Sequence, residues 1–223
     1  MKKYLTVLTA FMLTACLGME TEIDIKQNGS GTVNMTYRIS NELFSLGALP
    51  GNEDLPPVPV GREDFERTFN RIQGMEMVSY SEKDDGGDKV FSVKAKFDNL
   101  DALVNFLDAH GRQVTLAHSE DGRTVLSIRF DMSGETIDPD MAPILPLIFE
   151  NYFMDFNISF PNDCEVSYMD GEGGELPAMP FGETTVAAKR VVFHSPMAEL
   201  FTAGNPAVMV IRWAGQPAPN VRQ

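Results

Sequence analysis

Apolar and polar side chains alternate without a break from residue 33 to residue 40, and this pattern strongly constrains the fold. The apolar positions are Val33, Met35, Tyr37 and Ile39. Successive side chains of a β-strand point to opposite faces of a sheet, so the alternation predicts a strand with one buried face. The preceding Asn28-Gly29-Ser30-Gly31 is typical of a hairpin turn, and Ile23 and Ile25 alternate before that turn. The chain is therefore expected to contain an early pair of antiparallel strands.

Similar patterns predict further strands and helices. Strands are expected at residues 75–82, 89–97, 112–118, 124–131, 154–160, 166–168, 185–194 and 207–213. Helices are expected at residues 62–73, 99–111, 142–152 and 195–204. Asn99 is expected to cap the second helix, and Ser195-Pro196 is expected to begin the last one. Pairs of strands thus alternate with single helices.

The first sixteen residues form a separate pattern. Met1-Lys2-Lys3 is positively charged, residues 4–13 are mostly apolar, and Leu13-Thr14-Ala15-Cys16 follows. This is the layout of a secretory signal, and the apolar run is shorter than the about 20 residues that span a bilayer. A cysteine directly after Leu-Thr-Ala resembles the lipobox of bacterial lipoproteins. The plainer interpretations are an ordinary signal peptide and a membrane helix with a chance cysteine.

The lipobox resemblance implies cleavage after Ala15, lipid on the Cys16 sulfur and an acylated amino terminus. It also implies a protein of the cell envelope that is held on a membrane by lipid. Leu17 is not the Asp that commonly retains lipoproteins at the inner membrane. In a bacterium with two membranes, the outer membrane is therefore expected.

The order of the expected elements indicates an α+β fold, with a largely antiparallel sheet of strand pairs and three or four helices packed on one face. The strand-helix-strand stretches leave room for a parallel pair. Removing residues 1–15 from the 223 residues leaves 208, which suffice for one domain with a substantial core. The expected segments are a signal peptide at 1–15, a lipidated tether at 16–22, a single domain at 23–214 and a tail at 215–223.

Charge and cysteine content limit the partners. The net charge of −14 becomes −16 when Lys2 and Lys3 leave with the signal, which argues against binding to nucleic acid or anionic headgroups. The lipid on Cys16 must then hold the protein at the membrane. Of the two cysteines, only Cys164 would remain free, so no disulfide framework is expected. Acidic neighbours should raise its pKa and leave it packed and unreactive.

Several segments together resemble the LppM-type domain of bacterial lipoproteins. They are the lipobox, the strand pair around Gly29-Ser30-Gly31, the segments Phe97–Leu103 and Phe156–Pro161, and a closing strand that ends in Trp213. The resemblance covers most of the mature chain through loose motifs. It implies an α+β domain exposed in the envelope, with a lipid- or glycolipid-binding role, and it implies no particular site residues.

The sequence contains no convincing catalytic or metal-binding motif. The three histidines, His110, His118 and His194, lack the spacing of a zinc site, and neither Gly-x-Ser-x-Gly nor a phosphate or dinucleotide loop occurs. The acidic stretches at 84–88 and 131–140 lack the alternating oxygen ligands of a calcium loop and are expected to be solvated. A non-enzymatic protein without cofactor or metal is therefore expected.

The unusual feature is an apolar stretch before the 154–160 strand, in a chain with 13 methionines. Its side chains cover much of the circumference of the expected helix at 142–152, and they are Ile144, Leu145, Leu147, Ile148 and Phe149. Such a helix is either fully buried or meets a ligand or partner. Two functions follow. One is a binding module for an apolar or lipid-like ligand, and the other is a structural or assembly lipoprotein that binds another envelope protein.

Overall fold

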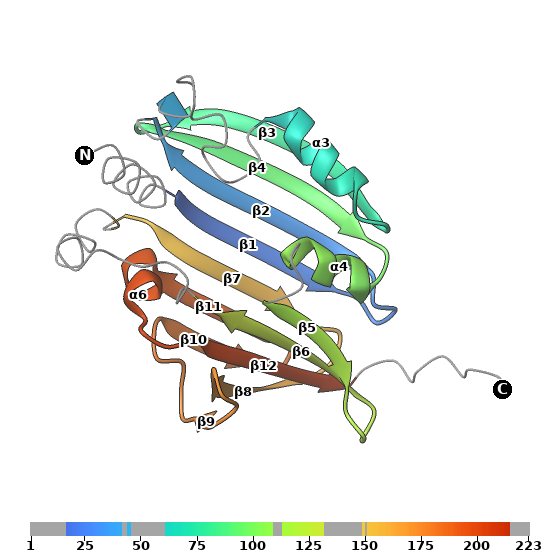
Figure 1. Cartoon of the computed structure of the whole chain (residues 1–223). Helices are drawn as coiled ribbons and strands as arrows, with labels where there is room; N and C mark the ends of the chain where they lie inside the picture. The colour runs from blue at the N-terminus through green and yellow to red at the C-terminus, as the bar shows by residue number, and fades with distance from the viewer. Residues whose placement is uncertain are drawn as a thin grey trace.

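The computed structural model describes residues 17–41, 44–45, 61–108, 113–131, 149 and 151–214. Within these ranges the chain forms two β-sheets and three short helices (Figure 1). No helix in this part is long and apolar enough to cross a membrane. The expected signal peptide at 1–15 and the tail at 215–223 lie outside the described residues.

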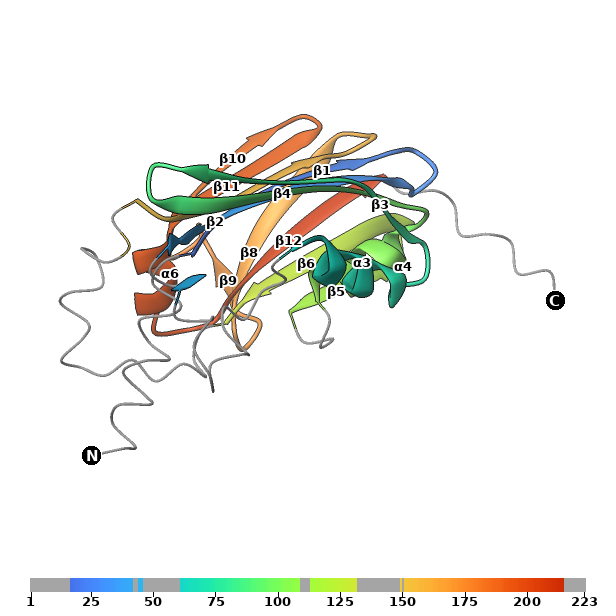
Figure 2. The same cartoon turned by 90° about the horizontal axis from the view of Figure 1, so that it is seen from above.

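The strands divide between a large and a small sheet. The large sheet contains β1 (Leu17–Ile25), β2 (Gly31–Ser40), β3 (Met75–Asp85), β4 (Asp88–Phe97), β7 (Phe153–Ser159), β10 (Glu183–Ala187) and β11 (Arg190–Pro196). Its strand order is β10-β11-β7-β1-β2-β4-β3. The small sheet contains β5 (Val114–His118), β6 (Arg123–Phe130), β8 (Cys164–Asp170), β9 (Glu175–Leu176) and β12 (Ala207–Ala214), in the order β5-β6-β12-β8-β9. The two sheets face each other across the main core (Figure 2).

The expected α+β fold, with three or four helices packed on one face of a sheet, is wrong. The protein is predominantly β, and the small sheet is the second layer of the main core. The helices α3 (Arg62–Asn70), α4 (Leu100–Leu107) and α6 (Met197–Thr202) have only nine, eight and six residues. They are too short to bury one face of a seven-stranded sheet. Alternation identifies each strand but not the sheet that it joins. The sequence-based prediction therefore assigned the strands of two sheets to a single sheet.

The early hairpin is confirmed. Lys26 donates its backbone N–H to the carbonyl of Ser30 at 2.8 Å, and Gly29 has a φ of +78°. A Cβ atom at Gly31 would lie 2.0 Å from the Asp24 carbonyl oxygen and 2.4 Å from Cζ of Phe97. Only glycine therefore allows the turn and the packing below it.

β1 occupies the centre of the large sheet because it also pairs with β7. This pairing is parallel, with Met19 opposite Met154 and Ile23 opposite Ile158. The strand-helix-strand stretches of the sequence left room for a parallel pair, whereas the observed pair joins strands far apart in the sequence. As a result, β1 and β7 begin at the same end of the sheet (Figure 1).

The first two helices form where the sequence predicts them. α3 places Phe65 and Phe69 in a second core, where the Phe65 ring lies 5.8 Å from the ring of Tyr37. The Asn99 side chain caps α4 by accepting a hydrogen bond from the N–H of Ala102 at 2.9 Å. α3 covers the β3–β4 side of the large sheet, and α4 lies between α3 and β5 of the small sheet (Figure 1).

Three details differ from the sequence-based expectation. The strand expected at 185–194 is the hairpin β10–β11, whose turn at 188–189 lacks Gly, Pro, Asn or Asp as a signal. Ser195 is fully buried at the end of β11, and α6 has no side-chain cap. β1 already begins at Leu17, so it occupies most of the range 16–22 that was expected to be a tether.

Candidate functional site

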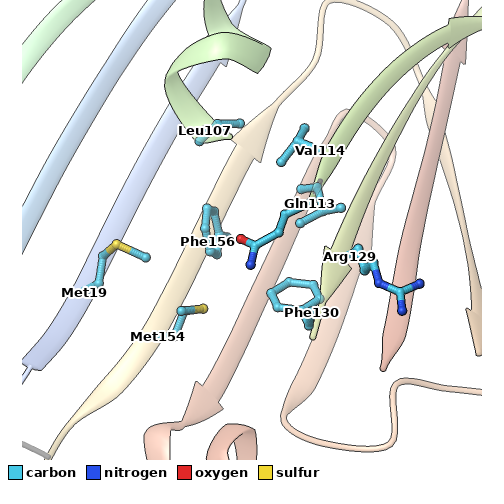
Figure 3. Close-up of a pocket in the computed structure, with 9 residues that line it drawn as sticks. Met19, Leu107, Gln113, Val114, Arg129, Phe130, Met154 and Phe156 are labelled. Atoms are coloured by element: carbon cyan, nitrogen blue, oxygen red, sulfur yellow. The ribbon is translucent and has the colours of Figure 1, made fainter. Parts of the chain in front are cut away.

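A pocket of about 140 Å³ lies between the two sheets, and we call it the inter-sheet pocket (Figure 3). Met19 of β1 and both Met154 and Phe156 of β7 line it from the large sheet. Val114 of β5 and both Ile128 and Phe130 of β6 line it from the small sheet. Leu107, Gln113 and Arg129 complete the lining. The lining is therefore mostly apolar and draws on two methionines and two phenylalanines.

The pocket lies at one end of the two sheets. Met19 and Met154 stand near the first residues of β1 and β7, while Phe130 is the last residue of β6 and Val114 the first of β5. Leu107 is the last residue of α4. The ends of strands from both sheets meet here, so the side chains fill the space between the sheets less completely than they do in the middle of the core.

An aromatic cluster forms one wall of the pocket. The ring of Phe130 meets that of Phe156 edge-on, with centroids 6.4 Å apart and planes at 79°. Phe130 also lies 4.9 Å from Phe193 and 5.9 Å from Phe181. Phe193 and Phe181 are almost fully buried. Edge-to-face contacts of this kind hold the rings in place, so this wall is formed before any ligand enters.

The polar groups at the rim are arranged so that one amide faces the pocket. The Arg129 guanidinium points away from it and donates to Asp131 Oδ2 at 2.9 and 3.0 Å and to the carbonyl of Gly171 at 3.3 Å (Figure 3). Gln113 extends its side-chain amide between Phe130 and Phe156 (Figure 3). The pocket thus combines an apolar lining with one neutral donor and acceptor.

Asp108 fixes the start of β5 beside the pocket. Its buried carboxylate accepts hydrogen bonds from the backbone N–H groups of Gln113 and Val114, the latter at 2.8 Å. Gln113 also accepts a hydrogen bond on its carbonyl from the N–H of Arg129 at 2.6 Å. The backbone that carries Gln113 is therefore held from both sides, although its side chain is exposed.

The size of the pocket limits what it can hold. An engineered apolar cavity of about 150 Å³ is large enough for benzene. At about 140 Å³, the inter-sheet pocket has room for one small ring or for the end of one alkyl chain. A whole lipid would have to remain mostly outside.

The apolar stretch singled out in the sequence is only partly within the described residues. Ile144, Leu145, Leu147 and Ile148 lie outside them. Phe149 is 2% exposed, belongs to the main core, and accepts a hydrogen bond from the N–H of Tyr152 at 3.0 Å. Cys16 also lies outside, directly before β1. The inter-sheet pocket has no signal in the sequence, because the β1–β7 pairing, which brings Met19 to Met154, cannot be read from local patterns.

The two described histidines, His118 and His194, do not form a buried cluster. Nδ1 of His194 lies 2.6 Å from Asp155 Oδ1, and its ring stacks on Phe153 with centroids 4.9 Å apart. The His194 and Asp155 side chains are 47% and 39% exposed, on the outer face of the large sheet. His118 is exposed at the end of β5, and His110 lies outside the described residues. Within the described part, no group of three or more His, Cys, Asp or Glu side chains could hold a metal ion.

A second hollow of about 140 Å³ lies on the outer face of the large sheet. Gly18 leaves space between Arg38 and Phe153, and the carboxylates of Glu20 and Asp155 border it. Arg38 is already paired with Asp85 at 3.3 Å. Charged side chains border this hollow and it lies on an open sheet face, so we regard the inter-sheet pocket as the candidate ligand site.

Cys164 behaves as a core residue. It is 9% exposed and forms no disulfide, and its Sγ lies 3.8 Å from the Ala187 carbonyl oxygen. Burial raises the pKa of the Cys164 thiol, and the Asp163 carboxylate adds to the rise. The expected direction of the shift is correct, but desolvation rather than acidic neighbours is its main cause.

No protein-family model and no curated protein matches the chain. Among solved structures, the chain is similar to the folded domain of the LppM protein of Mycobacterium tuberculosis, determined by NMR. The similarity covers 93% of this chain and 94% of that chain, with 16% sequence identity and a TM-score of 0.47. This is the domain type that the sequence motifs resemble, and a similarity of this degree carries over no site residue and no ligand.

Proposed function

We propose that this protein is a membrane-anchored lipoprotein of the cell envelope that binds an apolar or lipid-like ligand and catalyses no reaction. The observation that supports binding is the inter-sheet pocket, with its preformed aromatic wall and its single facing amide. An apolar lining with few, well-placed polar groups is the usual character of a small-molecule site.

The anchor in this proposal is lipid on Cys16. Its support is the Leu13-Thr14-Ala15-Cys16 pattern after a short apolar run. Because β1 begins at Leu17, a lipid on Cys16 would hold the domain directly against the bilayer. The strongly acidic chain has no electrostatic attraction to anionic headgroups, so the acyl chains would supply the binding. Leu17 in place of Asp supports the outer membrane as the location.

The absence of catalysis in this proposal follows from the groups around the candidate sites. The inter-sheet pocket presents an amide and apolar side chains, which supply neither a nucleophile nor a general base. His194 and Asp155 lie on the outer face and are more than one-third exposed. An exposed pair of this kind lacks the desolvated cleft that usually shifts catalytic groups.

The alternative function is binding to another envelope protein through an apolar surface. The exposed large hydrophobic side chains in the described part are Val78, Phe153 and Val186. Val78 and Val186 lie on β3 and β10, which are opposite edges of the large sheet, and Phe153 lies on β7 between them. They are too scattered to form one apolar patch, so ligand binding is the better-supported function.

Binding of methyl decanoate, an uncharged alkyl ester, measured by the shift of the Met19 ε-methyl NMR resonance, tests the proposal. The chain from residue 16 to residue 223 carries Cys16→Ser, and the added Met154→Trp fills the pocket. We expect the added tryptophan to weaken binding by roughly tenfold or more. Met169→Trp is the matched control, because Met169 lies outside the core cluster. Absence of binding by the parent chain, or equal binding by both tryptophan variants, would refute a ligand site between the sheets. Thermal melts check that each variant is folded.

A further inference from the structure

We propose that the inter-sheet pocket receives the end of an acyl chain carried by Cys16 of the same molecule while that molecule is outside a bilayer. This inference rests on the proposed function, since it requires both the lipid on Cys16 and a pocket that accepts an alkyl chain. It adds a specific occupant, which is the protein's own anchor.

The position of β1 supports this occupant. β1 starts from Leu17, to which Cys16 is bonded, at the same end of the sheets as the pocket. Met19, the third residue of β1, faces the pocket directly (Figure 3). Three residues of chain span at most about 11 Å, so the anchor lies no farther than that from Met19. A long acyl chain can span that distance and still insert its end.

The volume of the pocket also supports this occupant. The volume of about 140 Å³ fits the end of one alkyl chain and excludes several chains together. A lipoprotein anchor carries more than one chain, because one chain binds a bilayer only marginally. The pocket would therefore shield part of the anchor and leave the remaining chains free to enter a membrane.

The charge of the lining favours an uncharged occupant. Within the described lining, the cationic side chain is Arg129, and its guanidinium is turned away toward Asp131. The amide of Gln113, which faces the pocket, is neutral. The described lining therefore offers no unpaired cationic side chain to the carboxylate of a free fatty acid. An acyl chain joined through an ester or amide brings no charge that would need a cationic partner in the pocket.

Occupation of the pocket should depend on whether a bilayer is present. A bilayer and the pocket both remove methylene groups from water, so a chain gains little by leaving a bilayer for the pocket. In water, without a bilayer, only the pocket removes methylene groups of the acyl chain from the solvent. The pocket would accordingly be filled while the lipoprotein travels between membranes, and it would be vacated when the chains insert.

Methyl NMR of the chain from Cys16 to Gln223 tests this proposal. This chain contains every described element, since the first one begins at Leu17. Cys164→Ala leaves Cys16 as the single thiol, which is alkylated with an octyl group. We expect the ε-methyl resonances of Met19 and Met154 to shift and to show NOEs to the octyl chain. Met77, which packs in the second core under α3, should not change.

A matched control carries the octyl group at the other end of β1. In the background Cys16→Ser and Cys164→Ala, Lys26→Cys places the same thiol in the exposed hairpin turn. Octylation there should leave Met19 and Met154 unchanged, and equal shifts from both positions would refute a specific path from residue 16.

Free methyl decanoate added to the unalkylated chain separates this proposal from the proposed function. If methyl decanoate shifts Met19 and Met154 but the octyl group on Cys16 does not, the pocket binds ligands and the self-occupancy is wrong. If neither molecule shifts them, the proposed ligand site fails as well. Transfer of the octylated chain into phosphatidylcholine vesicles should restore the unalkylated resonances, and persistence of the shifts would contradict the conditional occupancy.

Discussion

Met19 of β1 lies directly opposite Met154 of β7 in a parallel pairing, and both side chains face the inter-sheet pocket. This relationship connects the segment that follows Cys16 with the segment that follows the apolar stretch at 144–149. The two methionines are flexible and polarizable, so they can adjust to ligands of different shape.

Phe156→Ala should destabilise the protein and weaken ligand binding. The ring is partly buried and forms the aromatic wall with Phe130, so we expect a loss of roughly 2–3 kcal/mol, below the range for a fully buried phenylalanine. Phe153→Ala, on the same strand but 36% exposed, should cost less than about 1 kcal/mol. Urea unfolding of both variants measures the difference, and equal losses would contradict the assigned faces of β7.

Gly31→Ala should destabilise the β1–β2 hairpin severely. The new Cβ atom would meet backbone at Asp24 and the Phe97 ring, so we expect a loss of about 3 kcal/mol or more. Gly204→Ala is a suitable control, because no atom lies within 4 Å of its Cβ position. Its effect should stay within about 0.5 kcal/mol. A tolerated alanine at residue 31 would show that the hairpin register is different.

Cys164 should react with iodoacetamide only after unfolding and should form no intramolecular disulfide. Burial raises the pKa of this thiol in the folded state. Its contribution to stability is therefore fully present below the unfolded pKa of about 8.5, and it is lost as the pH rises through the higher folded pKa. Thiol labelling of denatured, non-reduced protein checks the first statement. Urea midpoints across that alkaline range check the second, with Cys164→Ala as the control that lacks the dependence.

Mass spectrometry of protein from its native membranes should find a lipidated Cys16 at the amino terminus. Cys16→Ala should release the protein from membranes or stall its processing, because the thioether requires the thiol. Fractionation of a bacterium with two membranes should place the wild-type protein in the outer membrane. A mature terminus elsewhere with an unmodified Cys16 would overturn the anchor.

Leu145→Ala and Ile148→Ala should differ in their effects, although both positions lie outside the described residues. A helix with apolar side chains around much of its circumference cannot bury all of them against one sheet. One substitution should therefore lower stability by about 2–5 kcal/mol, and the other should mainly weaken ligand or partner binding. Thermal melts beside a lipid pull-down measure both effects. Similar stability losses with unchanged binding would assign the whole segment to the core.

Local sequence patterns determined the individual elements. The alternation from Val33 to Ile39 depends only on neighbouring residues, and it correctly predicts β2 and its buried face. Gly29 and Asn99 act within a few residues of themselves, in a turn and a helix cap, so their roles are also readable from the sequence. The β10–β11 hairpin was missed because its turn carries none of the usual turn residues.

The arrangement of these elements was decided only by the tertiary structure. Alternation indicates that Ile128 and Ile158 lie on the buried faces of their strands, but it does not indicate that the two strands belong to different sheets. The pairing of Met19 with Met154 joins strands far apart in the chain, and such pairings depend on the packing of the whole sheet. The inter-sheet pocket exists because strand ends from both sheets meet there. Neither the second layer nor the pocket has a local signature, which is why the fold class was wrong although most strands were correctly placed.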